Sequence, residues 1–151
     1  MKSEKPKTPW HLWAIGLVAL VWNAGGAFDY LMTQTRNMEY LTGGAQSIGV
    51  PVDVMVGYYT TFPAWADACW AFGVWGAVAG SLLLLLRSRF AFHAFAVALL
   101  GLIGTTIYTA ASDIPEGLST PFSWIFTAVI FLVTILLIFY ARRMTAAGVL
   151  R

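Results

Sequence analysis

A chain of 151 residues, 59% hydrophobic and only 11% charged, leaves no room for a separate soluble domain. Its net charge of +2 comes from basic residues that mostly flank apolar stretches. Since no basic stripe is interleaved with aromatic residues, we expect no nucleic-acid partner. The single cysteine, Cys69, excludes an internal disulfide and a cysteine-based metal cluster, and we expect it to be a small buried hydrophobe. No zinc-binding or phosphate-binding spacing occurs, so we expect neither a metal nor a cofactor.

Four apolar stretches are each long enough to cross a hydrocarbon core, because about 20 helical residues rising 1.5 Å each span about 30 Å. They are residues 10–32, 63–86, 90–111 and 122–141. The pattern predicts an all-α fold, a four-transmembrane-helix bundle in which residues 1–151 form a single transmembrane domain. The lipid bilayer is therefore the expected surroundings of most side chains.

The first stretch has a rival interpretation as a secretory signal. Lys2, Lys5 and Lys7 precede it, and Ala24-Gly25-Gly26-Ala27 imitates a cleavage site with small residues. However, the stretch is long for a signal core and is rich in bulky aromatic residues. These features favour a membrane span.

The segment between the first two spans contains Gly43-Gly44 and Gly49, which we expect to break regular structure. After Pro51, apolar residues recur at helical spacing: Val52, Met55, Val56 and Tyr59. This spacing predicts a short amphipathic helix on the outer membrane surface.

Eight of the nine Lys and Arg residues fall on one side of the alternating spans, and only Arg36 falls on the other. Short basic loops stay in the cytoplasm, so this distribution predicts that both termini are cytoplasmic, an N-in/C-in topology. Arg87-Ser88-Arg89 forms a turn so tight that the second and third spans must be antiparallel neighbours. The last connection, Ser112–Pro121, is a loop rich in helix-breaking residues.

Small residues mark the expected contacts between helices, because helices in lipid gain no hydrophobic energy by pairing. The glycines that we expect to pack are Gly26, Gly73, Gly76, Gly80, Gly101 and Gly104. The fourth span carries mainly large residues and should be peripheral. Packing within one chain and homo-oligomerisation through a glycine face are both open interpretations.

Counting residues from the helix ends places Asp29 and Asp67 in one layer of the outer leaflet, near Tyr108, with Asn23 deeper. Carboxylates inside a bilayer are costly and often functional. If the two carboxylates face each other, repulsion makes them share a proton or hold a cation. If they do not, they reach water or anchor helix ends. Asn23, Asp29, Asp67 and Tyr108 are the candidate residues for binding a solute or ion.

The histidines suggest two further chemistries. His11 and His93 lie near the inner ends of the first and third spans, and histidines from two helices can ligate haem. At the membrane–water interface, however, a partly solvated histidine needs no cofactor. Ser81 with His93 imitates a nucleophile and its base, but no acid lies at that depth to orient the imidazole. We therefore expect no enzymatic activity and no catalytic residues.

Two stretches carry a resemblance to known proteins: Trp22–Thr33, and Phe62–Trp65 continued through Phe72–Gly76 to Leu82–Arg87. They resemble a family of small bacterial four-span inner-membrane proteins, some of which carry a sugar-transporter label. The resemblance covers nearly the whole chain. It implies a four-span fold and a location in the bacterial inner (plasma) membrane.

Taken together, these features favour a non-enzymatic accessory or interaction subunit whose partner is another membrane protein or a second copy. The basis is a chain rich in packing glycines and poor in buried polar groups. The alternative is a small solute or ion transporter that uses the acidic pair of the outer leaflet. A dry, closed bundle would favour the first function, and a funnel that reaches Asn23 would favour the second.

Overall fold

The computed structural model describes residues 7–151, so the predicted placement of Lys2 and Lys5 lies outside the described part. The described residues form helices and connecting turns, with no strand among them. Four helices are long and apolar enough to cross a membrane: α1 (Trp10–Gln34), α4 (Ala64–Leu85), α5 (Ala91–Ala111) and α6 (Pro121–Ala146). The predicted all-α bundle with four spans is therefore confirmed.

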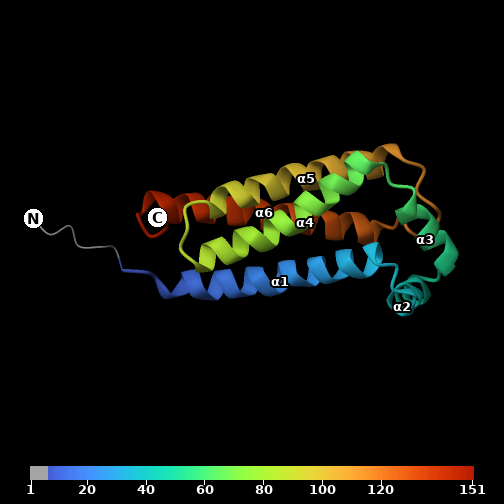
Figure 1. The fold of residues 1–151 in the computed structure, drawn as a ribbon, viewed down its shortest axis with the longest axis horizontal. Helices are drawn as coiled ribbons and strands as arrows, with labels where there is room; N and C mark the ends of the chain where they lie inside the picture. The colour runs from blue at the N-terminus through green and yellow to red at the C-terminus, as the bar shows by residue number, and fades with distance from the viewer. Residues whose placement is uncertain (1–6) are drawn as a thin grey trace, which may run out of the picture.

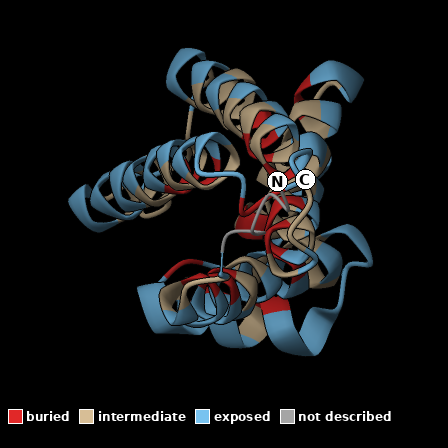
Figure 2. Cartoon of the chain, turned by 90° about the vertical axis from the view of Figure 1, so that its left-hand side faces the viewer, coloured by how far each residue is buried: buried red, intermediate tan, exposed pale blue. Residues whose placement is uncertain are grey.

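The four long helices run side by side along the molecule, and the two ends of the chain lie together at one end (Figure 1). In packing order, α1 contacts α4, α4 contacts α5, and α5 contacts α6. Within the described residues, α1 and α6 do not pack against each other along their length. Exposed residues follow the outward faces of the helices, as Figure 2 shows from the end that carries both termini. The bundle is thus a row of antiparallel neighbours whose first and last members meet only locally.

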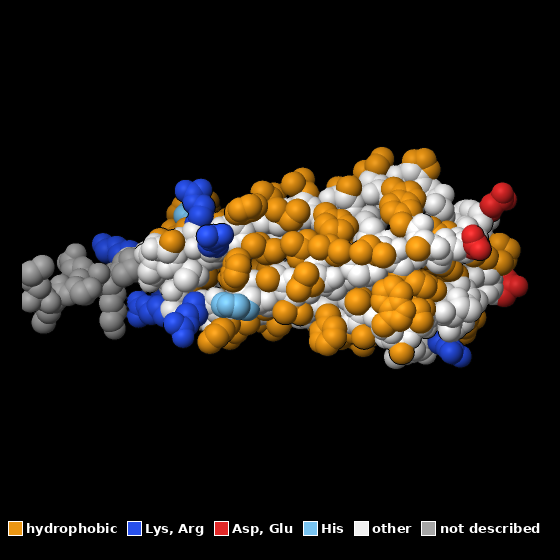
Figure 3. Space-filling view, turned by 90° about the horizontal axis from the view of Figure 1, so that it is seen from above, with side chains coloured by type: hydrophobic (Ala, Val, Ile, Leu, Met, Phe, Trp, Pro, Cys, Tyr) orange, Lys and Arg blue, Asp and Glu red, His pale blue; other side chains and the backbone are white. Residues whose placement is uncertain are grey.

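Basic side chains gather at the end that carries both termini, and acidic side chains gather at the opposite end (Figure 3). We call these the basic end and the acidic end. At the basic end, Arg87 adopts φ 57° in the α4–α5 turn. The last residue of the chain joins this turn, since the Arg151 amide donates to the Arg87 carbonyl (2.8 Å) and the Arg89 amide donates to the Arg151 carbonyl (3.0 Å). The C-terminus is therefore tied to the turn between α4 and α5.

The main hydrophobic core fills the half of the bundle toward the basic end. All four long helices contribute to it, together with the chain after α6, and Phe95 is its largest fully buried side chain. Next to this core, the imidazole Nδ1 of His11 lies 2.6 Å from the hydroxyl of Tyr140, which joins α1 to α6. In this half the bundle is closed.

The closest helix contact lies between α4 and α5, where glycines allow the two backbones to approach. A Cβ added at Gly101 would collide with the backbones of Cys69 and Gly73, and one at Gly76 would lie 3.0 Å from the amide nitrogen of Ala98. A Cβ at Gly80 would meet the Phe95 ring at 2.6 Å, and one at Gly104 would meet the Cys69 sulfur at 2.5 Å. Five of the six glycines expected to pack thus lie at this interface: Gly73, Gly76, Gly80, Gly101 and Gly104.

Two short helices, α2 (Met38–Ile48) and α3 (Val52–Thr60), cross the acidic end (Figure 1). The predicted short helix after Pro51 is confirmed as α3. The expectation that Gly43-Gly44 breaks regular structure is wrong, because both glycines lie inside α2.

The reason for α2 lies in its caps and its tertiary contacts. The Asn37 side chain accepts a hydrogen bond from the Tyr40 amide (3.0 Å), and Gly49, at φ 71°, ends the helix in the left-handed conformation. Leu41 and Ala45, one turn apart, are buried against Met55 of α3. These interactions outweigh the cost of about 1 kcal/mol that each glycine imposes on a helix.

Candidate ligand-binding cavity

A cavity of about 860 Å³ occupies the half of the bundle toward the acidic end. We call it the central cavity. Each of the first three long helices presents one face to it, with residues spaced i, i+3, i+4 and i+7. These faces are Trp22, Gly25, Gly26 and Asp29 of α1; Trp70, Gly73, Val74 and Ala77 of α4; and Leu102, Thr105, Thr106 and Thr109 of α5. The side of α6 that carries Ser123, Thr127 and Thr134 completes the wall.

Small residues on α1 help to create this space. A Cβ built at Gly25 or at Gly26 would meet no atom within 4 Å. Gly26 therefore lines the cavity and is not a helix contact, contrary to the expectation from its small size. The physical reason is rotational: the face of α1 that carries Gly26 also carries Trp22 and Asp29, and it points away from the α1–α4 contact made by Asn23.

Hydroxyl groups line the walls formed by α5 and α6. Thr105, Thr106, Thr109, Thr127 and Thr134 each donate a hydrogen bond to the carbonyl four residues earlier, at 2.7–3.0 Å. Such bonds satisfy a solitary hydroxyl in an apolar helix. They use the hydroxyl proton and leave oxygen lone pairs, so these walls offer hydrogen-bond acceptors to a ligand.

Asn23 closes the deep end of the cavity. Its amide nitrogen donates to the Ser81 hydroxyl (2.9 Å) and to the Ala77 carbonyl (3.3 Å), and Ser81, which is fully buried, donates in turn to the same carbonyl (2.9 Å). This network joins α1 to α4 where the closed half of the bundle begins. Asn23 therefore acts in helix packing and also borders the cavity.

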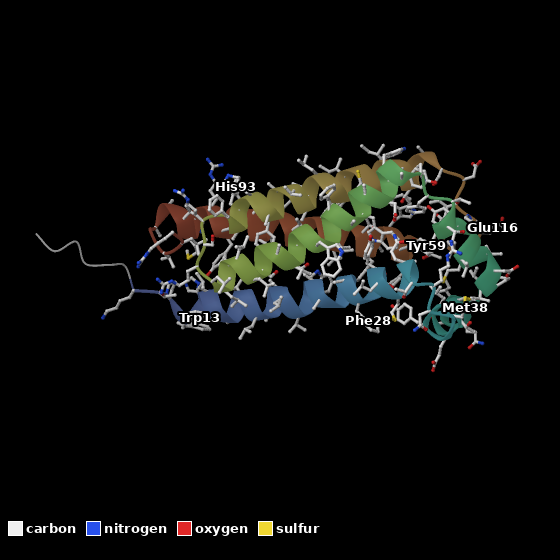
Figure 4. All side chains as sticks on the ribbon, viewed as in Figure 1. Trp13, Phe28, Met38, Tyr59, His93 and Glu116 are labelled. Atoms are coloured by element: carbon white, nitrogen blue, oxygen red, sulfur yellow. The ribbon has the colours of Figure 1, made fainter. Side chains whose placement is uncertain are left out.

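Asp29 lies on the cavity wall near the acidic end, where Tyr40 of α2 donates its hydroxyl proton to the carboxylate (2.7 Å). Burial, the hydrogen bond to Asp29 and its negative charge together raise the pKa of Tyr40 to about 12. Burial and then the charge of Asp29 raise the pKa of Tyr59 to about 12 as well. Tyr59 reaches from α3 back into the bundle (Figure 4). Both phenols therefore stay neutral at ordinary pH and remain proton donors.

Asp67 has a different partner and a different cavity. Gln34 donates its side-chain amide to the Asp67 carboxylate, and both residues line a smaller cavity of about 140 Å³ together with Arg36 and Tyr59. Tyr108 packs edge-on against the rings of Phe62 (4.7 Å between centroids) and Trp65 (5.6 Å). Of the four candidate binding residues, Asn23 and Asp29 line the central cavity, while Asp67 and Tyr108 lie outside its lining.

His11 and His93, the two histidines considered as haem ligands, have different neighbours in the structure. His11 pairs with Tyr140, whereas His93 packs against the rings of Phe90 and Phe92. Ser81, which sequence reasoning paired with His93, instead contacts Asn23. In the part of the chain that the structure describes, no group of three or more His, Cys, Asp or Glu residues is arranged to hold a metal ion.

The side of the cavity between α1 and α6 is bridged by one aromatic pair. The rings of Trp22 and Phe126 lie 5.9 Å apart, inclined by 48°. Both rings line the cavity and are also exposed on the surface of the bundle, as is Val21 beside them. Apart from this pair and the contacts at the basic end, α1 and α6 make few contacts in the described residues, so little backbone closes this side of the cavity.

Sequence reasoning missed the hydroxyl-lined walls, although a signal was present. Thr105, Thr106 and Thr109 recur at helical spacing on one face of α5, and Ser123 and Thr127 do so on α6. Such polar stripes on apolar helices indicate a face that avoids lipid.

In comparisons with known proteins, the chain matches no family model, no curated protein and no solved structure. The site is therefore interpreted from its own geometry.

Proposed function

We propose that this protein binds a small amphipathic solute in the central cavity and acts as a small membrane-embedded solute-binding or transport protein. The observation that carries the proposal is a cavity of about 860 Å³ with a mixed lining inside a bundle of apolar helices. Ligand sites range over about 300–1,000 Å³ and combine apolar walls with a few polar groups.

This function ranks ahead of an accessory subunit that acts only by contact. Association between helices in lipid depends on close packing of small residues. Gly25 and Gly26 lie on the cavity wall between Trp22 and Asp29, and a Cβ at either meets no atom of another helix within 4 Å. Contact through an outer surface does not require such a cavity, whereas solute binding does.

We further propose an orientation. By the positive-inside rule the basic end faces the cytoplasm, so the central cavity lies in the outer leaflet. The resemblance to small four-span proteins is the basis for proposing the bacterial plasma membrane as the location. In this arrangement a solute reaches the cavity from the lipid, between α1 and α6, or past α2 and α3 at the acidic end.

Binding of N-phenyl-1-naphthylamine, a neutral fluorophore that accepts energy from tryptophan, tests the proposed function. Trp22, Trp70 and Trp124 line the cavity, so a probe bound there receives tryptophan emission. With the protein in lipid nanodiscs, we expect energy transfer that saturates, above the linear background of probe dissolved in lipid. Empty nanodiscs supply that background.

Gly26→Phe is the informative variant, because its ring enters the cavity without meeting another atom near the Cβ. We expect it to remove the saturable component. Gly44→Phe is the matched control, since a Cβ at Gly44 also meets no atom within 4 Å and Gly44 does not line the cavity. If wild-type protein shows no saturable transfer, or if both variants bind the probe equally well, the proposed function is wrong.

A further inference from the structure

We infer that the solute is an amphipathic organic cation whose positive group lies beside Asp29. This inference rests on the proposed function and names its substrate class. It depends on three features of the central cavity: its charge, its aromatic lining and the direction of its hydrogen-bonding groups.

The first feature is charge. Among the described residues that line the cavity, Asp29 alone carries a full charge. Its hydrogen-bond partner there is a neutral phenol, that of Tyr40. The Asp29 side chain is exposed, so its carboxylate is open to a solute that enters the cavity. A bound cation pairs with this negative charge, whereas an anion is repelled by it.

The second feature is the set of aromatic rings at the acidic end of the cavity. Tyr40, Tyr58, Tyr59, Phe62 and Trp70 line the cavity at its acidic end. The rings of Tyr59 and Trp70 are stacked with 5.6 Å between their centroids, and the ring centroids of Phe62 and Tyr58 lie 5.3 Å apart. The faces of such rings attract ammonium-type cations, and the attraction grows when the cation loses its water.

The third feature is the direction of the hydrogen-bonding groups on α5 and α6. The threonine hydroxyls of these helices donate their protons to backbone carbonyls. At the start of α6, Pro121 has no N–H, and the Ser123 amide donates to the Thr120 hydroxyl (3.1 Å), so these groups do not attract an anion. The walls formed by α5 and α6 therefore present lone pairs, which suit a cation or a donor-bearing solute.

The remaining lining explains why the cation should be amphipathic. Leu102, Phe126 and Ile130 give the walls formed by α5 and α6 an apolar surface. The lipid-facing side between α1 and α6, bridged by Trp22 and Phe126, admits a molecule that already resides in the bilayer. A hydrophobic body therefore lies against α5 and α6, with its charged group toward the acidic end.

A pair of probes with equal shape and opposite charge tests the inference: tetraphenylphosphonium, a cation, and tetraphenylborate, an anion. Equilibrium dialysis against protein in lipid nanodiscs measures both, with empty nanodiscs as the blank. We expect saturable binding of tetraphenylphosphonium and no saturable binding of tetraphenylborate. Asp29→Asn keeps the hydrogen bond from Tyr40 but removes the charge, and should weaken the binding of the cation about tenfold.

Asp67→Asn is the matched control, because Asp67 lies in the smaller cavity, and it should leave the affinity within about twofold of wild type. Unchanged binding of N-phenyl-1-naphthylamine by Asp29→Asn shows that this variant is folded. Equal binding of both ions, or equal losses in the two variants, overturns the choice of a cation while the proposed function stands. Loss of every saturable signal, including that of the neutral probe, overturns both.

Discussion

The two halves of the bundle are built from similar apolar helices, yet one half is filled and the other is hollow. Toward the basic end, Phe95 and its neighbours from all four helices form a buried core, and His11 joins α1 to α6 through Tyr140. Toward the acidic end, the same helices border a cavity of about 860 Å³ that is open between α1 and α6. Residue size accounts for part of the difference, since Phe95, Leu12 and Leu84 fill the core, whereas Gly25 and Gly26 leave space on the α1 wall of the cavity.

The comparison also shows that a glycine in a membrane helix has two opposite uses. At Gly101 the missing side chain lets two backbones touch, and at Gly25 it leaves open space. Both residues look alike in the sequence. Only the neighbouring helix distinguishes a contact from a cavity wall.

The largest expected effect comes from exchanging these two uses. Gly101→Leu forces a side chain into the backbones of Cys69 and Gly73, which cannot yield as a flexible side chain would. We expect the free energy of unfolding to fall by about 3 kcal/mol or more. Gly25→Leu, which meets open space, should change it by less than about 0.5 kcal/mol. Reversible unfolding in mixed micelles measures both, and similar losses in the two variants would show that the α4–α5 contact and the α1 wall of the cavity do not differ in packing.

A smaller effect is expected at the junction of the two halves. Asn23→Ala removes the hydrogen bonds to Ser81 and Ala77, while Ser81 keeps its own bond to the Ala77 carbonyl. Hydrogen bonds between membrane helices average about 0.6 kcal/mol, so the loss should be about 1 kcal/mol. A double-mutant cycle with Ser81→Ala isolates the pair. A coupling energy of zero would mean that the bond between Asn23 and Ser81 does not contribute to joining α1 to α4.

The smallest effect is one of pH and concerns the acidic end. Tyr40 and Tyr59 have pKa values of about 12 in the folded protein, above the ordinary value of 10. Each neutral phenol therefore stabilises the fold fully below pH 10, and this contribution is lost as the pH rises through about 12. Tyrosinate absorbance should show these two groups ionising late, and Tyr40→Phe should remove one late step. Ionisation of all tyrosines near pH 10 would contradict the contact with Asp29.

Much of the fold was predictable because membrane spans depend on length and hydropathy along the chain. The four spans and the tight turn at Arg87 follow from those local properties. The helix α2 was not predictable from its glycines, because its stability comes from the burial of Leu41 and Ala45 against Met55.

The binding residues were harder to predict because the position of a side chain depends both on its depth along the helix and on its direction around the helix axis. Counting residues along the helices set Asp29 and Asp67 at one level, but the direction of each side chain around its helix decided its partner. Asp29 turned out to face Tyr40 and the central cavity, and Asp67 to face Gln34 and the smaller cavity.

By itself, the sequence determined that four helices can cross a membrane and which residue types lie near each end, since both depend on composition along the chain. The tertiary structure alone decided that α1 and α6 stay apart and that their small residues border a cavity. The physical reason is that lipid rewards no particular pairing of apolar faces. Which faces meet is settled by side-chain shape and by a few hydrogen bonds between residues distant in the sequence.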